Sequence, residues 1–477
     1  MALHSKPTRN RREFVTDAFC GFGSLALADM VAAEYGSAAR AATVNPLAPK
    51  KPTNPDRAKA KSAVFLFMAG GPSHMETFDP KPILNKLHGQ KRPAEFGEAK
   101  YQFVQANATL LGTKRTFKKY GKSGIEVSDL LPHMAECVDD MAVIRSVHAD
   151  MVVHSAAQYQ MFTGRILPGF PSIGSWLLYG LGTESKSLPG YVVLPDPHGA
   201  LEAGIPMYSN GFLPAVYQPT HFRSGPKPVL NLDLPQGVSK EDRIRTLGLI
   251  KGLDQADMRP GDQELEARIG AYDLAFRMQS EAPEVFDLSK ESQQTLEMYG
   301  IGNPITDDYG RRLLLTRRLL EKGVRFVCPV HGGGPGNLQW DAHEDIEENH
   351  LRMAAQSDKP IAGFLKDLKQ RGMLDSTLVM WGGEFGRSPE SQGGKGRDHH
   401  NLGFSMWMAG GGIKGGQVVG ATDDIGLKAI QDPYHLRDIH TTILNQLGLD
   451  QDAVSFLHSG RRERLTEVRG RVITQIV

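Results

Sequence analysis

Apolar segments of strand length alternate with amphipathic helical segments along most of this chain, and no other feature restricts its fold as much. The apolar segments lack the polar alternation of half-exposed strands, so we expect them to be strands buried on both faces. They span residues 63–69, 141–147, 191–194, 324–330, 377–381 and 404–409. Helical patterns with one apolar face span residues 308–322, 360–371 and 435–447. This order predicts an α/β fold with a doubly wound, mostly parallel sheet and helices on both faces.

The size and composition of the chain fit one large globular domain. The 477 residues suffice for an α/β domain with an insertion, which we expect at about 196–281, where a segment rich in proline and glycine precedes a helical one. Lysine and arginine number 55 and aspartate and glutamate 54, so the charge gives no reason to expect a nucleic acid partner. The three cysteines form no C-x-x-C pair, which indicates neither a disulfide framework nor a cysteine zinc site.

The N-terminus has the features of an export signal. Asn10-Arg11-Arg12-Glu13-Phe14-Val15 fits the twin-arginine pattern, residues 18–28 are uncharged but too few to span a bilayer, and Ala39-Arg40-Ala41 offers a cleavage site. We expect a twin-arginine signal peptide at 1–41, an extended proline-rich linker at 42–61 and the α/β domain at 62–477. The protein would then be periplasmic or extracellular, without a transmembrane anchor. The alternative is an amphipathic N-terminal helix of a cytoplasmic protein.

Polar clusters follow four of the expected strands. In a parallel sheet the carboxyl ends of the strands lie at one edge, so we expect the four clusters to meet in one site. The clusters are Ser73, His74, Glu76 and Asp79; His148, Asp150, His154 and Ser155; His331, Asp341 and His343; and Glu384, Arg387, Arg397, Asp398, His399 and His400. The simpler interpretation is that Gly-Gly-Pro-Ser makes only a turn, that Asp398 caps a turn and that His400 packs in the core.

The clusters combine imidazole and carboxylate groups and contain no cysteine. This donor set suits Zn²⁺, Mn²⁺ or Fe²⁺, so we expect a divalent metal cofactor, with zinc or manganese favoured over calcium or magnesium. The expected metal ligands are His74, Asp341, His343, Glu384, Asp398 and His399. An oxyanion could be bound through paired hydrogen bonds by Arg165, Arg387 or Arg397.

Several long motifs give the chain a resemblance to a known family. The stretches FLFMAGGPSHMETFDPKP, YGRRLLLTRRLLEKGVRFVCPVHGGG, WDAH, GGEFGRSP and GRDHHNLGFSMWMAGGGIKGGQVVGATD resemble the exported family called domain of unknown function 1501 over nearly the whole chain. That family is similar to the alkaline phosphatase and sulfatase superfamily. The resemblance implies the α/β core of that superfamily, a site for one or two metal ions, and hydrolysis of phosphate or sulfate esters.

The resemblance also implies roles for single residues. The segment HSAAQYQMFTGR is similar to the sulfatase segment that carries the nucleophile, and it puts His154 where sulfatases have the cysteine or serine that becomes formylglycine. Glu384 takes the place of a metal-binding aspartate, and Asp341 with His343 resembles the aspartate and histidine of one phosphatase metal site. The first strand ends in Gly70-Gly71 instead of a metal-binding aspartate, so His74 is expected to supply the missing ligand.

Together these features predict an exported metal-dependent hydrolase of phosphate or sulfate esters, with a small-molecule or polysaccharide substrate. The candidate nucleophiles are a metal-bound water, Ser73, Ser155 and His154 itself. The alternative is a metal-containing binding protein of the same fold at the cell surface, in which the altered nucleophile position has ended turnover. A purely structural metal site is also open, and so is the oligomeric state.

Overall fold

The computed structural model describes residues 45–97, 107–225, 227–229, 232, 234, 236–257 and 263–477. The chain divides into a unit of residues 1–45 and a unit of residues 46–477, and every helix and strand of the described part belongs to the second. The expected signal peptide at 1–41 lies outside the described residues. Within the described ranges, no helix combines the length and apolar character needed to cross a membrane.

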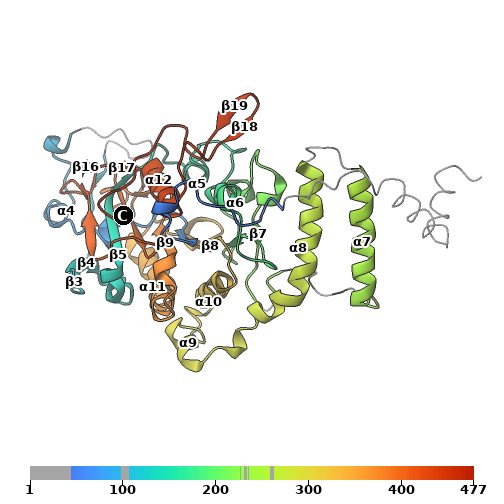
Figure 1. Cartoon of the computed structure of the whole chain (residues 1–477). Helices are drawn as coiled ribbons and strands as arrows, with labels where there is room; N and C mark the ends of the chain where they lie inside the picture. Colours follow the sequence, from blue (N-terminus) through green and yellow to red (C-terminus); the bar gives the residue numbers. More distant parts are fainter. Residues whose placement is uncertain are drawn as a thin grey trace, which may run out of the picture. The chain divides into compact units, whose positions relative to one another are not determined.

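A nine-stranded sheet with the order β14-β5-β13-β9-β1-β8-β6-β7 forms the centre of this unit, and β17 pairs with β5 outside that path. Its strands β5, β9, β8 and β7 are labelled in Figure 1. Its strands are β1 (Ser62–Met68), β5 (Met141–His148), β6 (Tyr191–Leu194), β7 (Thr220–His221), β8 (Phe326–His331), β9 (Thr377–Gly382), β13 (Phe404–Ala409), β14 (Gln417–Val419) and β17 (Tyr434–His435). Of these described strands, β13 alone runs antiparallel to its neighbours β5 and β9. The sheet is therefore mostly parallel, as the sequence predicts.

Helices cover both faces of the sheet. The helices are α3 (His74–Thr77), α4 (Pro82–Lys86), α5 (His154–Thr163), α6 (Ile173–Leu181), α7 (Lys240–Asp257), α8 (Gln263–Phe286), α9 (Gln293–Met298), α10 (Asp307–Glu321), α11 (Ile346–Gln370) and α12 (Leu436–Gln446). On β1, Phe65 and Phe67 pack into a core with residues of α5, α6 and α12, whereas Leu66 and Met68 pack into a second core with residues of α10 and α11. The doubly wound arrangement is confirmed.

Among the described residues, five short strand pairs form separate two-stranded sheets outside the central sheet. They are β2 (Thr109–Leu110) with β11 (Glu390–Ser391), β3 (Phe117–Tyr120) with β4 (Ile125–Ser128), β10 (Gly386–Arg387) with β12 (His399–His400), β15 (Ala421–Thr422) with β16 (Ala429–Gln431), and β18 (Phe456–His458) with β19 (Arg461–Glu463). The pairing of β10 with β12 sets Arg387 opposite His399. It therefore joins the segment after β9 to the segment before β13.

All six expected strands are present in the central sheet, with bounds that differ by at most two residues. The expected helix at 360–371 is the second half of the longer helix α11, which continues through Pro360. The segment expected as an insertion holds α7 and α8, which lie side by side in Figure 1, but it also contributes β7 to the sheet. In the expected linker, the backbone of Asn54, Lys59 and Ala60 bonds to carbonyls of Gly448 and Gln446.

Candidate metal centre

Five of the predicted site residues come together at one edge of the sheet. His154 is the first residue of α5, which follows β5, and Glu384 comes just after β9. Asp341 and His343 lie in the loop between β8 and α11. His399 belongs to β12 and precedes the antiparallel β13, so it reaches the same edge from the opposite chain direction. The group therefore forms where the parallel strands β5, β8 and β9 end and the antiparallel strand β13 begins.

Each of the three histidines has its Nδ1 atom held by an acceptor. Such an acceptor fixes the proton of a neutral imidazole on Nδ1 and leaves the lone pair on Nε2 free, as in histidines that bind metals. The contacts are His154 Nδ1 to Glu384 Oε1 at 2.7 Å, His343 Nδ1 to Asp398 Oδ1 at 3.2 Å and His399 Nδ1 to the Val152 carbonyl at 2.7 Å. The three Nε2 atoms are thereby turned away from these acceptors.

The carboxylate of Asp341 is the point on which the Nε2 atoms converge. Asp341 Oδ1 lies 3.1 Å from His343 Nε2 and 3.3 Å from His399 Nε2, and the two Nε2 atoms are 2.9 Å apart. These separations are close to the roughly 3.3 Å between donor atoms that share a tetrahedral zinc ion at bond lengths of about 2.0 Å. Ligand atoms of His154, Asp341 and His399 also lie within 4.8 Å of one another. The donor set therefore fits a divalent metal ion.

His154 faces the other oxygen of the same carboxylate. Its Nε2 is 3.5 Å from Asp341 Oδ2, and this buried nitrogen has no hydrogen-bond partner among the described residues. A buried, unsatisfied ring nitrogen is costly, unless a ligand or a proton occupies it in the working protein. His154 is thus poised beside the donor triangle of Asp341, His343 and His399 and is not one of its corners.

The charges of the group shift its pKa values strongly. Burial raises the pKa of Asp341, but Arg387 and the three histidines outweigh burial and hold that pKa far below its usual range. Burial lowers the pKa of His154, but the neighbouring carboxylates of Asp341 and Glu384 overcome it and raise the pKa to about 9. Burial lowers the pKa of His399 to about 4, against the opposing effect of Asp341. These shifts favour a charged carboxylate on Asp341, a protonated His154 and a neutral His399 when no metal is bound.

Two glycines at the end of β1 form the floor of this site. A Cβ on Gly70, which has φ +101°, would lie 2.5 Å from the backbone nitrogen of Asp341, and its own N–H donates to Glu384 at 3.1 Å. A Cβ on Gly71, with φ +79°, would lie 2.7 Å from the ring of Phe385. The strand ends in two glycines because its backbone packs directly against the segments that hold Asp341 and Glu384.

The predicted oxyanion-binding arginines are all engaged with protein acceptors. Arg387 donates to Asp341 Oδ1 at 2.7 Å and to the carbonyls of Gly70, Gly71 and Arg397, and Arg397 pairs with Glu76 at 2.8 Å. Both side chains are fully buried. Arg165 pairs with Glu463 and Glu467 beside a cavity of about 470 Å³. In this structure Arg387 orients Asp341, whereas Arg165 and Arg397 form ion pairs with glutamates.

The cluster that follows β1 is not brought into the group. His74 bonds through Nε2 to the Gly426 carbonyl at 2.9 Å, and the hydroxyl of Ser73 donates to Glu76. His74 and Ser73 are both buried. Ser155 is half-buried in the first turn of α5, and Asp398 acts behind His343 through its contact with Nδ1. The predicted role of His74 as a metal ligand is therefore not supported by its contacts, because its Nε2 faces the Gly426 carbonyl.

Sequence reasoning missed three polar residues connected to the group. Gln158 donates to Glu384 at 3.2 Å and to Glu202 at 2.8 Å, and Gln339 donates to Glu202 at 2.8 Å. The position of Gln158, one helical turn after His154, is a signal that the sequence contained. Glu202 and Gln339 lie in loops without any such periodic signal.

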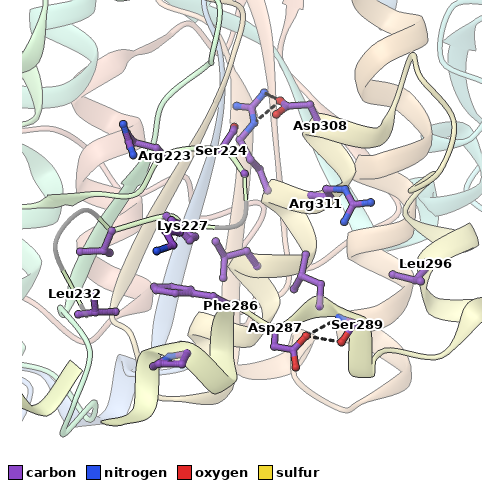
Figure 2. A pocket seen from close by; sticks show the side chains of 17 residues that line it. Arg223, Ser224, Lys227, Leu232, Phe286, Asp287, Ser289, Leu296, Asp308 and Arg311 are labelled. Carbon is purple, nitrogen blue, oxygen red and sulfur yellow. Dashed lines mark hydrogen bonds and ion pairs between the residues drawn. The ribbon is translucent and has the colours of Figure 1, made fainter. Parts of the chain in front are cut away.

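A second cavity, of about 780 Å³, lies beside α8 and α10 (Figure 2). Its lining combines cationic, acidic and apolar side chains, among them Arg223, Arg311, Asp287, Asp308, Phe286 and Leu296. None of the predicted site residues lines it, so it is separate from the metal centre.

Solved structures align with the chain at low similarity, and no curated protein matches it. The lipoteichoic acid synthase LtaP from Listeria monocytogenes aligns over 88% of this chain and 79% of that one, with 11% identity and a TM-score of 0.39. The sulfatase PsFucS1 from Pseudoalteromonas sp. aligns over 90% of this chain and 71% of that one, with 13% identity and a TM-score of 0.35. The alkaline phosphatase from the Antarctic bacterium TAB5 aligns over 83% of this chain and 99% of that one, with 9% identity and a TM-score of 0.33.

The family resemblance carried by the long motifs is confirmed over the whole α/β unit. Residues 60–477 match the family described as "Protein of unknown function (DUF1501)", and the chain is a member of that family.

Proposed function

We propose that this protein is a divalent-metal-dependent hydrolase of phosphate or sulfate esters that is exported in folded form. The observation that supports this most is the donor triangle of Asp341, His343 and His399, in which each imidazole is oriented from behind by an acceptor at Nδ1. Imidazole and carboxylate donors favour zinc or manganese. A metal held by three protein ligands keeps a position open, which is typical of catalytic and not of structural sites.

The residues around the triangle have separate roles in the proposed reaction. A divalent ion in this place would polarise the ester and lower the pKa of a bound water. Arg387 holds the Asp341 carboxylate in position from the buried side. His154 faces the second Asp341 oxygen with an 11% exposed side chain, so it can exchange a proton with the leaving oxygen of the ester. Glu384 fixes the ring of His154 for this transfer.

One observation favours the binding-protein alternative. Arg165, Arg387 and Arg397 all form ion pairs with protein carboxylates, so these three predicted oxyanion binders are committed elsewhere and do not offset charge that develops on the ester oxygens. A site with this limitation could hold an anionic ester through its metal without fast turnover. The metal-loaded protein decides between the two functions.

The test is hydrolysis of 4-nitrophenyl phosphate and 4-nitrophenyl sulfate by protein loaded with Zn²⁺ or Mn²⁺. We expect turnover that requires the metal, loss of both metal and turnover in His399→Ala, and loss of turnover with retained metal in His154→Gln. Asp375→Asn, an exposed carboxylate outside the site, is the control. Stoichiometric metal without hydrolysis of either ester would instead favour the binding protein.

A further inference from the structure

Two buried glutamine side chains hold an exposed carboxylate beside the metal centre. Gln158 Nε2 donates to Glu202 Oε2 at 2.8 Å, and Gln339 Nε2 donates to Glu202 Oε1 at 2.8 Å. Both glutamines are almost completely buried, whereas Glu202 is exposed. Surface carboxylates are normally held by water and free to rotate, so two buried amide groups committed to one of them indicate that its orientation has a function.

The glutamines themselves are fixed by the backbone. Gln158 Oε1 accepts from the N–H of Ala203, and Gln339 Nε2 also donates to the carbonyl of Gly334 at 2.7 Å. Since Glu202 precedes Ala203, the same glutamine side chain binds the Glu202 carboxylate and the next backbone amide. Both carboxylate oxygens of Glu202 are therefore bonded to side-chain amides that are themselves bonded to the backbone.

This carboxylate lies close to the reacting groups. Gln158 Nε2 contacts both Glu202 Oε2, at 2.8 Å, and Glu384 Oε1, at 3.2 Å, so these two oxygens are at most 6.0 Å apart. Glu384 in turn contacts His154 at 2.7 Å. On the other side, Gln339 precedes Trp340 and Asp341, and the space above Gly70 is closed by Gln339 Cβ and the Asp341 backbone nitrogen. Glu202 thus stands at the rim of the metal centre.

The chemistry of Glu202 restricts what can bind there. Each oxygen accepts one amide hydrogen bond from the buried side, and a carboxylate oxygen has further acceptor capacity on its exposed side. The phosphate or sulfate end of a substrate is repelled by a fixed negative charge, so that end has to face the metal. The group that faces Glu202 must be uncharged or cationic and must donate hydrogen bonds.

We propose that Glu202 is a specificity-determining residue that binds hydroxyl groups on the alcohol part of the ester. The preferred substrates are then phosphate or sulfate esters of polyhydroxylated alcohols such as sugars, and not of aryl or alkyl alcohols. This rests on the proposed function, because the metal centre has to hold the anionic end of the ester.

The test measures binding instead of turnover, so it can fail separately from the proposed hydrolysis. Two phosphonates, whose P–C bond resists hydrolysis, are titrated calorimetrically into the zinc-loaded protein: phenylphosphonate and a glucose 6-phosphonate. We expect Glu202→Gln to reduce the preference for the sugar ligand by about 10-fold, which is typical for loss of a hydrogen bond to a charged group. Glu297→Gln is the matched control, because Glu297 is also exposed and also accepts from a glutamine amide, that of Gln293.

Three results would overturn the proposal. One is that Glu202→Gln has the same ratio of affinities for the sugar phosphonate and phenylphosphonate as the wild type. Another is that neither phosphonate binds to the zinc-loaded wild-type protein. The third is loss of metal from Glu202→Gln, because Glu202 would then act as a cation ligand. A protein that hydrolyses no ester but shows the expected change in ratio would disprove the hydrolase and retain the sugar-binding role of Glu202.

Discussion

The Nδ1 atom of His154 lies 2.7 Å from Oε1 of Glu384, and this contact turns the opposite ring nitrogen toward Asp341. Glu384 is completely buried and also accepts hydrogen bonds from the Gly70 backbone and from Gln158. A carboxylate at the end of β9 thus orients an imidazole at the start of α5. Because the two residues come from distant parts of the chain, the relationship depends on the sheet order.

Glu384→Gln should lower the pKa of His154 from its value of about 9. The substitution keeps the shape of the side chain but removes a charge that stabilises the imidazolium, and its amide keeps one acceptor oxygen for three donors. Affinity for zinc should stay close to that of the wild type, because Glu384 orients His154, which lies beside the donor triangle and is not one of its corners. NMR titration of the histidine ring nitrogens measures the pKa, and competition with a chelator measures the affinity.

The control for this substitution is Glu348→Gln, in the exposed first turn of α11. It should leave both quantities unchanged. An unaltered His154 pKa in Glu384→Gln would mean that Asp341 alone controls the imidazole.

Gly70→Ala should destabilise the protein by about 3 kcal/mol or more, because the added Cβ meets the backbone of Asp341 in a conformation that alanine rarely adopts. Gly372→Ala is the matched control: Gly372 also has a positive φ, of +67°, but open space around it. It should cost only about 1 kcal/mol from backbone strain. Urea unfolding measures the loss of free energy of unfolding in both variants. Equal losses would show that the close approach of backbone at Gly70 does not contribute to stability.

The sequence predicted the sheet well because its strands are buried on both faces and therefore read as continuous apolar runs. Placing polar residues at strand ends was enough to bring His154, Asp341, His343, Glu384 and His399 into one group. The same reasoning could not tell that His74 turns to the Gly426 carbonyl, because the direction of a side chain after a tight turn depends on contacts with distant loops. The hydrogen bonds of Gln158 and Gln339 to Glu202 could not be predicted for the same reason.

The arginines illustrate a second limit of the sequence. Arg387 and Arg397 have the residue type and the position of oxyanion binders. Both guanidinium groups instead donate buried hydrogen bonds to backbone carbonyls around the loop after β9. A long cationic side chain can reach either a ligand or a carbonyl a few ångströms away, and local sequence does not distinguish the two. Only the three-dimensional placement of Asp341, Glu76 and the glycine carbonyls assigns them.

Replacing Arg11 and Arg12 together by lysine should trap the precursor in the cytoplasm. The twin-arginine pathway reads the guanidinium pair, and lysine preserves the charge but not the planar hydrogen-bonding group. Cell fractionation followed by immunoblotting measures the location, and a single Lys6→Arg substitution is the control outside the motif. Mature protein outside the cytoplasm in the double variant would rule out this route.

Acid should destabilise the folded protein through buried histidines outside the metal centre. Burial lowers the pKa of His350 to about 3, and its Nε2 accepts the backbone N–H of Ser73 at 2.9 Å, which requires the neutral ring. The unfolded chain takes up this proton near the ordinary value of 6.5, whereas the folded chain does not. Since the unfolded state binds more protons between these values, the contribution of His350 is fully present above pH 6.5 and is lost as the pH falls toward 3.

His350→Gln isolates this contribution, because a glutamine oxygen can still accept from Ser73 but does not titrate. The free energy of unfolding, measured in urea at several pH values from 7 down to 4, should fall less steeply with acid in this variant than in the wild type. His458→Gln, at an exposed position in β18, should keep the wild-type slope. Identical slopes in all three proteins would mean that His350 is protonated in the folded state and that its bond to Ser73 is not maintained, because a ring that titrates equally in both states adds no pH dependence.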